Sequence, residues 1–129
     1  MVGDVRLGAG SVVDERTSVR ADEGSPIVIG AGADIEDAVT FHALKGTSIR
    51  IGARLVADGA TVYHGPPVAG DDLRVDADAV VFRVRIGNRV TIGEGALVAG
   101  PADDPLEVPD GTVIPPRARV TTQAEVDAL

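Results

Sequence analysis

The chain of 129 residues contains two histidines, His42 and His64, and no cysteine. They stand in the segments TFHAL and VYHGP, each directly after an aromatic residue. Two neutral imidazoles that lie close together can share one metal ion, and a catalytic zinc ion usually has three protein ligands and a water molecule. A metal site built on this pair therefore needs the two side chains on neighbouring elements and a third donor from elsewhere. The alternative is a pair of surface histidines in contact.

A six-residue repeat determines where these histidines lie. Aliphatic or aromatic residues recur every six positions in triplets: Leu7/Val13/Val19, Ile29/Ile35/Phe41, Ile51/Ala57/Tyr63, Ala69/Val75/Val81 and Ile86/Ile92/Val98. Extra residues enter only between triplets, and the step from Val81 to Ile86 is one residue short. Periods of 3.6 and 2 fit less well, which disfavours helices and an ordinary β-sandwich.

The residues that follow the repeat positions fall into three columns. The glycine column follows the first unit of each triplet and consists of Gly8, Gly30, Gly52, Gly70 and Gly87. The acidic column follows the second unit and consists of Asp14, Glu36, Asp58 and Asp76, with Gly93 in the last triplet. The histidine column follows the third unit and consists of Arg20, His42, His64, Phe82 and Ala99.

Three units with three distinct columns predict a triangular prism, a parallel β-helix of hexapeptide repeats with about five to six coils over residues 1–120. Val2 and Gly3 then belong to a further coil before the first triplet. We expect each coil to turn at its glycine through a backbone conformation that other residues disfavour. We also expect His42 and His64 to project from one edge, about 4.8 Å apart along the stack.

Composition and charge exclude several classes of protein. The net charge of −8 argues against binding to nucleic acid, because phosphate recognition needs a basic surface. No apolar run is long enough to cross a membrane, and the N-terminus lacks the pattern of a signal peptide. With no cysteine for disulfides, the sequence favours a cytoplasmic protein that associates with no membrane.

The acidic column suggests how copies of the chain associate. Four carboxylates at neighbouring positions repel one another unless positive charge compensates them. Arg20 and the histidines lie in another column, so the acidic edge of one prism can face the basic edge of the next. A cyclic trimer with sites between subunits follows as a hypothesis. A solvated acidic face is the alternative.

The C-terminal region departs from the repeat. Residues 101–110 are expected to form a loop, and residues 111–120 an extended closing segment. In residues 121–129 a threonine cap and Glu125 predict the start of a helix. A helix this short is not stable alone, so we expect it to dock on the prism or to belong to a longer helix.

The motifs then identify a family. The chain resembles the γ-class carbonic anhydrases, left-handed β-helix zinc trimers, in the segments SVRADEGSPIVIG (18–30), DIEDAVTFHAL (34–44), VYHGPPVAGDD (62–72), VVFRVRIGN (80–88) and VIPPRARVTTQAEVDAL (113–129). The ordered series RxDEG, HAL and HGP is more specific than a generic hexapeptide repeat. The resemblance implies left-handed coils, and also an upstream coil and a full C-terminal helix beyond the residues of this chain.

The resemblance implies roles for individual residues. His42 and His64 match two zinc ligands, and Glu23 matches a glutamate proposed to help proton movement. Arg20 and Asp22 match residues that tie subunits together, facing the aspartate that matches Asp37. In the family, zinc lowers the pKa of a bound water, and the hydroxide so formed attacks CO2 to give bicarbonate.

Two positions differ from the family pattern. Gly59 stands where the resemblance implies the remaining zinc-ligand histidine, and Glu36 stands where it implies a glutamine that orients substrate or water. Three outcomes follow: no metal binds; Asp58 or Glu36 supplies a carboxylate ligand to zinc; or iron or cobalt binds to two histidines and more water.

The sequence therefore leaves three functions open. The first is a γ-carbonic-anhydrase-like enzyme that acts on CO2 and bicarbonate, with activity weakened or lost through Gly59. The second is a catalytically inactive homotrimeric scaffold. The third is a hexapeptide acyltransferase, in which a histidine deprotonates an acceptor; the RxDEG and HGP motifs favour the first two.

Overall fold

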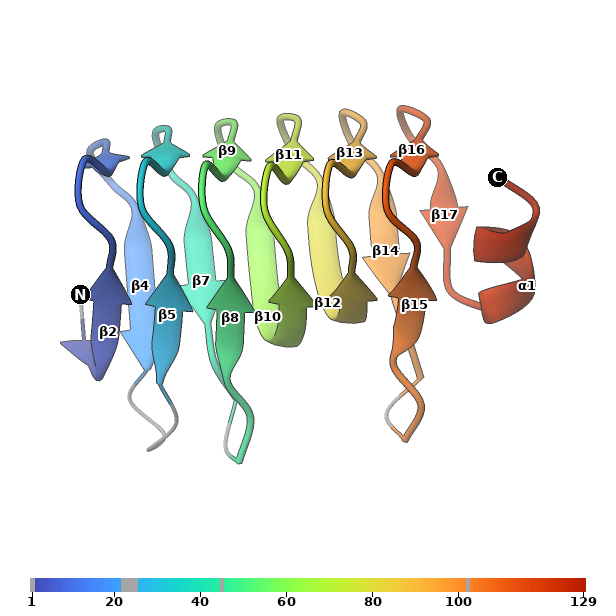
Figure 1. Cartoon of the computed structure of the whole chain (residues 1–129), viewed down its shortest axis with the longest axis horizontal. Helices are drawn as coiled ribbons and strands as arrows, with labels where there is room; N and C mark the ends of the chain where they lie inside the picture. The colour runs from blue at the N-terminus through green and yellow to red at the C-terminus, as the bar shows by residue number, and fades with distance from the viewer. Residues whose placement is uncertain (1, 22–25, 45, 102) are drawn as a thin grey trace.

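The computed structural model describes residues 2–21, 26–44, 46–101 and 103–129, which form a parallel β-helix with three faces (Figure 1). The first face contains β2 (Val5–Leu7), β5 (Ile27–Ile29), β8 (Ile49–Ile51), the second halves of β10 (Val62–Ala69) and β12 (Val80–Ile86), and β15 (Leu106–Val108). The second face contains β3 (Val12–Val13), β6 (Asp34–Ile35), β9 (Val56–Ala57), β11 (Arg74–Val75), β13 (Thr91–Ile92) and β16 (Val113–Ile114). The third face contains β1 (Val2–Gly3), β4 (Ser18–Ala21), β7 (Thr40–His42), the first halves of β10 and β12, β14 (Leu97–Ala99) and β17 (Arg119–Val120).

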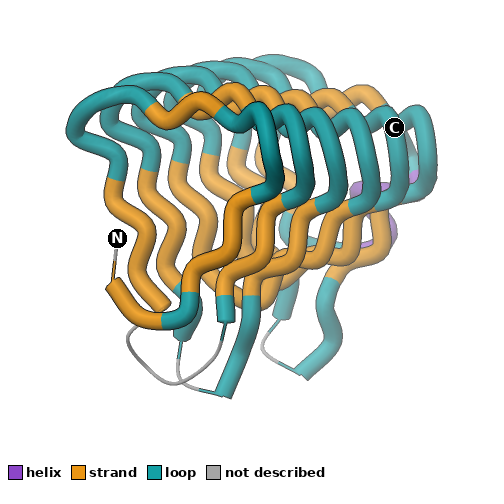
Figure 2. Tube along the Cα trace, turned by 60° about the vertical axis from the view of Figure 1, so that its left-hand side comes forward, coloured by secondary structure: helices purple, strands orange, loops and turns teal. Residues whose placement is uncertain are grey.

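Every strand pairs in parallel with the equivalent strand of the next coil, and Figure 2 shows the coils stacked one behind another with turns at the corners. The second face is a six-stranded sheet, whereas the first and third faces share one eleven-stranded sheet because β10 and β12 continue around the corner between them. The predicted fold class is confirmed, and the pairing of Val2 with Arg20 places β1 in a further coil as expected.

Two local expectations are corrected by the structure. Residues 101–110 are not wholly a loop, because β15 pairs with the second half of β12 and opens a coil that β16 and β17 complete. The short step between Val81 and Ile86 is a tightened corner: the register against β10 shifts between His64 and Pro67, and Arg83 turns the chain with a φ of 53°.

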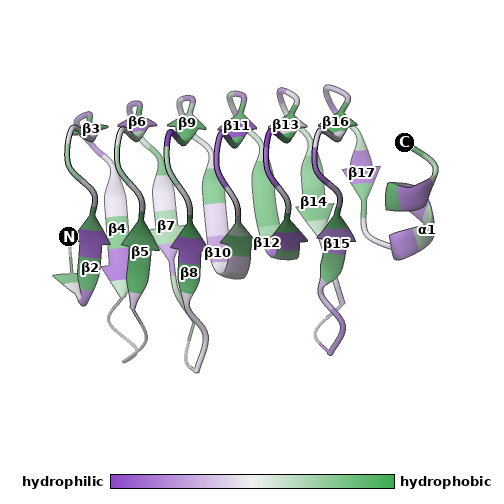
Figure 3. Ribbon diagram, in the orientation of Figure 1, coloured by the Kyte–Doolittle hydropathy of each residue, from purple (hydrophilic) through white to green (hydrophobic). Residues whose placement is uncertain are grey.

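The core consists of the inward-facing aliphatic residues of all three faces. Side chains alternate between interior and exterior along each strand, and Figure 3 shows this as purple bands between green ones on β2 and β8. On the third face, Phe41 and Tyr63 are fully buried and their rings stack at 4.4 Å with an interplanar angle of 8°. The repeat positions of the sequence are therefore the core positions of the fold.

The reason for the glycine column differs from the one expected. None of its members has a positive φ; the left-handed residues lie elsewhere in the turns and include Gly10, Gly32, Arg54 and Asp72. Instead, a Cβ on Gly30 would lie 2.7 Å from the carbonyl carbon and oxygen of Gly52 in the next coil. Close approach of two backbones, and not backbone conformation, requires glycine here.

The helix α1 (Gln123–Asp127) follows β17 and contacts β15 and β17 at the end of the prism. Thr122 is its N-cap, since its hydroxyl accepts a hydrogen bond from the Glu125 amide at 3.2 Å. Val126 is buried. The predicted cap is thus confirmed, and the helix docks on the β-helix. In the described part of the chain no helix has the length and apolar character needed to span a membrane.

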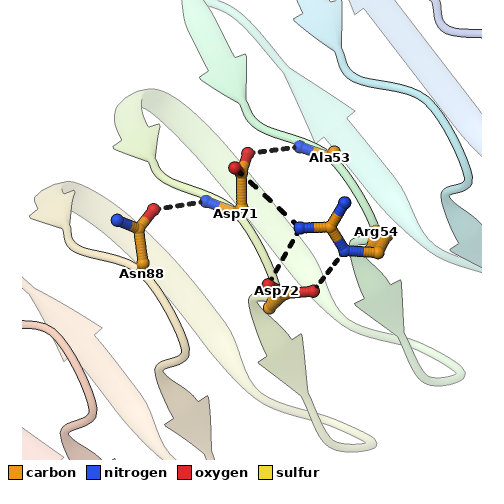
Figure 4. A network of polar contacts seen from close by, with 5 residues as sticks. All are labelled: Ala53, Arg54, Asp71, Asp72 and Asn88. Atoms are coloured by element: carbon orange, nitrogen blue, oxygen red, sulfur yellow. Dashed lines mark hydrogen bonds and ion pairs between the residues drawn. The ribbon is translucent and has the colours of Figure 1, made fainter.

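A ladder of polar side chains joins successive coils at the corner between the first and second faces (Figure 4). The Asp71 carboxylate accepts from the Ala53 amide at 2.8 Å, and the Asn88 side-chain oxygen accepts from the Asp71 amide at 2.7 Å. Arg54 donates two hydrogen bonds to Asp72, at 2.6 and 3.0 Å. These side chains hold each coil in register with the next where the glycine column brings the backbones together.

The Arg54–Asp72 pair gives a prediction about pH. Hydrogen bonds from Arg54, together with its charge, lower the pKa of the Asp72 carboxyl below its ordinary value of 3.8. A lowered carboxyl pKa stabilises the fold above the unfolded value, and this contribution is lost as pH falls through the folded value. We therefore expect Arg54→Gln to raise the pKa of Asp72 and to destabilise the fold slightly at neutral pH, with no difference from the unchanged protein at strongly acidic pH.

The pKa is measured by NMR titration of the carboxyl carbons, and the stability by urea unfolding at several pH values. Arg16→Gln is the matched control, because Arg16 pairs with Asp37 at a different corner and should leave the pKa of Asp72 unchanged. An Asp72 pKa that is the same in Arg54→Gln and in the unchanged protein would contradict this prediction.

Candidate functional site

The histidine column lies at the edge where the third face meets the first. Parallel pairing places Arg20 beside His42, His42 beside His64, and His64 beside Phe82. The rings of His42 and His64 have centroids 5.5 Å apart at an interplanar angle of 71°. The prediction that the two imidazoles occupy successive rungs of one edge is confirmed.

Phe82 and Arg83 continue the column beyond His64. The centroids of His64 and Phe82 are 5.6 Å apart, and the guanidinium carbon of Arg83 lies 4.1 Å from the centroid of the Phe82 ring. Burial lowers the pKa of the His64 imidazole, and the neighbouring His42 lowers it further. The geometry thus favours the neutral form of His64, which is the form that binds a metal. Sequence analysis placed Phe82 in this column but missed Arg83, which the shortened corner brings over the ring.

The spacing of the two imidazoles fits one shared metal ion. Two imidazoles bonded to a tetrahedral ion at about 2.0 Å have centroids about 5 Å apart, close to the observed separation. A third donor is missing, however: among the described residues no three His, Cys, Asp or Glu side chains come together. The described residues of one chain therefore do not fit a three-ligand zinc site.

The acidic column lies at a different corner, where the second face meets the third. Backbone hydrogen bonds place Asp14, Glu36, Asp58 and Asp76 on successive coils. Arg74 extends along this column, with nitrogens 2.9 Å from the Asp76 carboxylate and 3.9 Å from that of Asp58. Sequence analysis missed this compensating charge, although Arg74 precedes the inward Val75 and so had to face outward.

The remaining predicted site residues are distributed as follows. Asp37 follows the acidic column and forms a two-pronged ion pair with Arg16 of the preceding coil. Asp22 and Glu23 lie outside the described residues. The structure therefore brings Arg20, His42 and His64 together, but it holds Glu36, Asp37 and Asp58 at another corner. The predicted carboxylate ligands do not meet the histidines within one chain.

Between these two columns the third face presents a row of outward, half-buried side chains. Register places Ser18, Thr40, Val62, Val80, Leu97 and Arg119 side by side along this row, of which Arg119 is exposed. Its middle members Val62, Val80 and Leu97 form an apolar row, with the acidic column on one side and the histidine column on the other. Each member directly precedes the inward-facing residue of the third unit in its coil. Strand alternation alone could therefore have placed these side chains on the outer surface.

Known proteins with similar sequences match the chain over its whole length. A carbonic anhydrase of Methanosarcina thermophila is 30% identical over 148 residues, which cover 100% of this chain and 58% of that protein. The carboxysome assembly protein CcmM of Synechococcus elongatus is 33% identical over 139 residues, and this chain spans 25% of its length. The CcmM protein of Nostoc is 31% identical over 139 residues, and this chain spans 24% of its length. No family model matches the chain.

The fold and the repeat define a parallel β-helix protein of the hexapeptide type. The relatives then confirm the resemblance to the γ-class carbonic anhydrases: the chain is homologous to a carbonic anhydrase and to CcmM. The chain spans from about a quarter to less than two thirds of the length of these proteins, so the homology concerns only the part of each that matches this chain.

Proposed function

We propose that this chain is a carbonic-anhydrase-like assembly module whose copies associate side by side through the third face, and whose CO2 hydration is weakened or lost. The third face is the observation that carries the proposal. An apolar row lies there between a carboxylate column and a column with arginine and histidine. Two of the relatives are named as assembly proteins.

The arrangement of charge favours a ring over a two-fold dimer. The acidic and histidine columns border opposite sides of the third face, so carboxylates of one copy meet Arg20 and the imidazoles of the next when these two corners are in contact. Such a head-to-tail contact closes into a ring if the rotation allows. The ring we propose is a homotrimer, and burial of the valine and leucine row stabilises it.

The assembly is tested by a charge placed in the apolar row. We expect Val80→Asp to reduce the assembled mass to that of the monomer, because an unpaired carboxylate would be buried between copies. The monomer should stay folded, since the Val80 side chain is only half-buried within one chain. Light scattering gives the mass, and circular dichroism reports the fold.

Val68→Asp is the matched control, because Val68 is the same residue type on the first face and is 42% exposed. It should leave the assembled mass unchanged. Equal masses for Val80→Asp and Val68→Asp, whether both assembled or both monomeric, would contradict an interface on the third face.

CO2 hydration is the second candidate, favoured by the spacing of His42 and His64 and by the relative named carbonic anhydrase. It requires zinc, iron or cobalt on the two imidazoles and a further donor from a neighbouring copy, for which Asp58 and Glu36 are the candidates. Stopped-flow assays of metal-supplemented protein test it. Hydration that disappears in both His42→Ala and His64→Ala would support this second candidate, and no hydration would leave assembly as the function.

A further inference from the structure

Gly59 lies in the turn between the second and third faces, at a position that other coils fill with larger residues. The Ala60 amide donates to the Asp37 carbonyl at 3.1 Å, and the Asp78 amide donates to the Gly59 carbonyl at 3.1 Å. The same pattern of amide-to-carbonyl bonds identifies the equivalent residues as Glu15, Asp37, Ala77 and Glu94. Four coils therefore form this turn with a side chain at this position, so the turn itself does not require glycine.

The surroundings of Gly59 also leave room for a side chain. Its φ lies outside the left-handed region, and a Cβ built on it would meet only the Asp37 carbonyl oxygen, at 3.3 Å. By contrast, a Cβ on Gly30 would lie 2.7 Å from the backbone of the next coil. Neither the backbone conformation nor the packing around this position therefore requires glycine at Gly59.

We infer that a three-donor metal site between copies has been reduced to a two-imidazole half-site by the loss of one side chain, with the backbone at Gly59 still able to present the third donor. The inference rests on the proposed side-by-side assembly, because Gly59 lies at the acidic corner and the histidines lie at the opposite border of the third face. The cation is a divalent metal that imidazole ligands suit, such as zinc or cobalt.

The half-site has a clear chemical consequence. Two imidazoles alone hold such an ion weakly, since water fills its remaining ligand positions. An imidazole introduced at Gly59 in one copy would face the histidine column of the next copy. The unchanged protein should therefore bind metal poorly, whereas a single substitution should restore strong binding.

The test is a titration of chelator-treated protein with Co²⁺, at concentrations where light scattering shows assembly. We expect Gly59→His to bind Co²⁺ about 100-fold more tightly than the unchanged protein, with the intense visible absorption of four-coordinate cobalt. Gly59→Ala adds a Cβ without a donor and should behave as the unchanged protein. Gly59→His combined with His64→Ala should lose the gain.

Two results would overturn the inference. One is an unchanged protein that binds Co²⁺ as tightly as Gly59→His. The other is an assembled, folded Gly59→His protein that binds no better than Gly59→Ala. The mass measured in the same samples distinguishes failure of this inference from failure of the proposed assembly. A protein that stays monomeric at every concentration contradicts the side-by-side contact, and therefore also the inference, which needs a neighbouring copy.

Discussion

Gly30→Ala should destabilise the β-helix by about 3 kcal/mol, at the upper end of the usual cost of overpacking. The new Cβ would lie 2.7 Å from the carbonyl carbon and oxygen of Gly52 and 2.8 Å from the Ala53 nitrogen. All three contacts are backbone atoms of the next coil, and no rotamer change can move them away. The two coils must separate locally, which weakens the parallel pairing of β5 with β8. Urea unfolding followed by circular dichroism measures the loss.

Gly59→Ala is the matched control for Gly30→Ala, since it adds the same methyl group to a glycine outside the left-handed region. Its nearest contact is one carbonyl oxygen at 3.3 Å, which a small shift relieves. We expect a change within about 0.5 kcal/mol, as for ordinary surface substitutions. A similar loss of stability in both variants would show that close approach of the coils is not the reason for the glycine column.

Phe41→Ala is expected to cost about 3–5 kcal/mol, the usual range for removing a large aromatic side chain from a core. Phe41 is fully buried and stacks on Tyr63 at a centroid distance of 4.4 Å. The coils of a β-helix contact only their neighbours, so the cavity cannot be filled from elsewhere in the chain. Urea unfolding measures the loss, and a change below about 1 kcal/mol would contradict a core that depends on this stack.

Tyr63→Phe is the matched control, because it keeps the stacked ring and removes only the hydroxyl. Burial raises the pKa of the Tyr63 phenol, which therefore stays protonated. Its hydroxyl lies near that of Thr61 but forms no hydrogen bond of good geometry within the described part of the chain, because the Thr61 hydroxyl donates to the Asp58 carbonyl, and a buried polar group without a partner is unfavourable. We expect Tyr63→Phe to be neutral or slightly stabilising. A large loss would mean that the hydroxyl has a structural partner.

Much of the fold could be predicted from the sequence because nearly every coil repeats the same six-residue pattern of inward-facing residues. The six-residue spacing fixes which residues face inward, and the stacking of identical coils fixes which residues become neighbours. That is why His42 and His64 could be placed on adjacent rungs before any coordinates. The last coil, formed by β15, β16 and β17, escaped prediction because β15 begins after an irregular segment, where the spacing to the preceding triplet is broken.

The candidate site was predicted in part. The histidine pair, the acidic column and Gly59 follow from the repeat and from the resemblance. Arg74 and the outward row with Val80 could have been found from strand alternation. The packing of Arg83 on Phe82 could not, since it depends on a corner in which one residue adopts a left-handed conformation.

The sequence alone determined the prism, its inward residues and the pairing of the two histidines, because these follow from a local period repeated along the chain. Only the tertiary structure decided that the glycine column arises from backbone contact between coils, and that Arg83 packs on the Phe82 ring. The reason is that distances between coils and between corners depend on how the coils stack and turn, which a spacing in sequence does not specify.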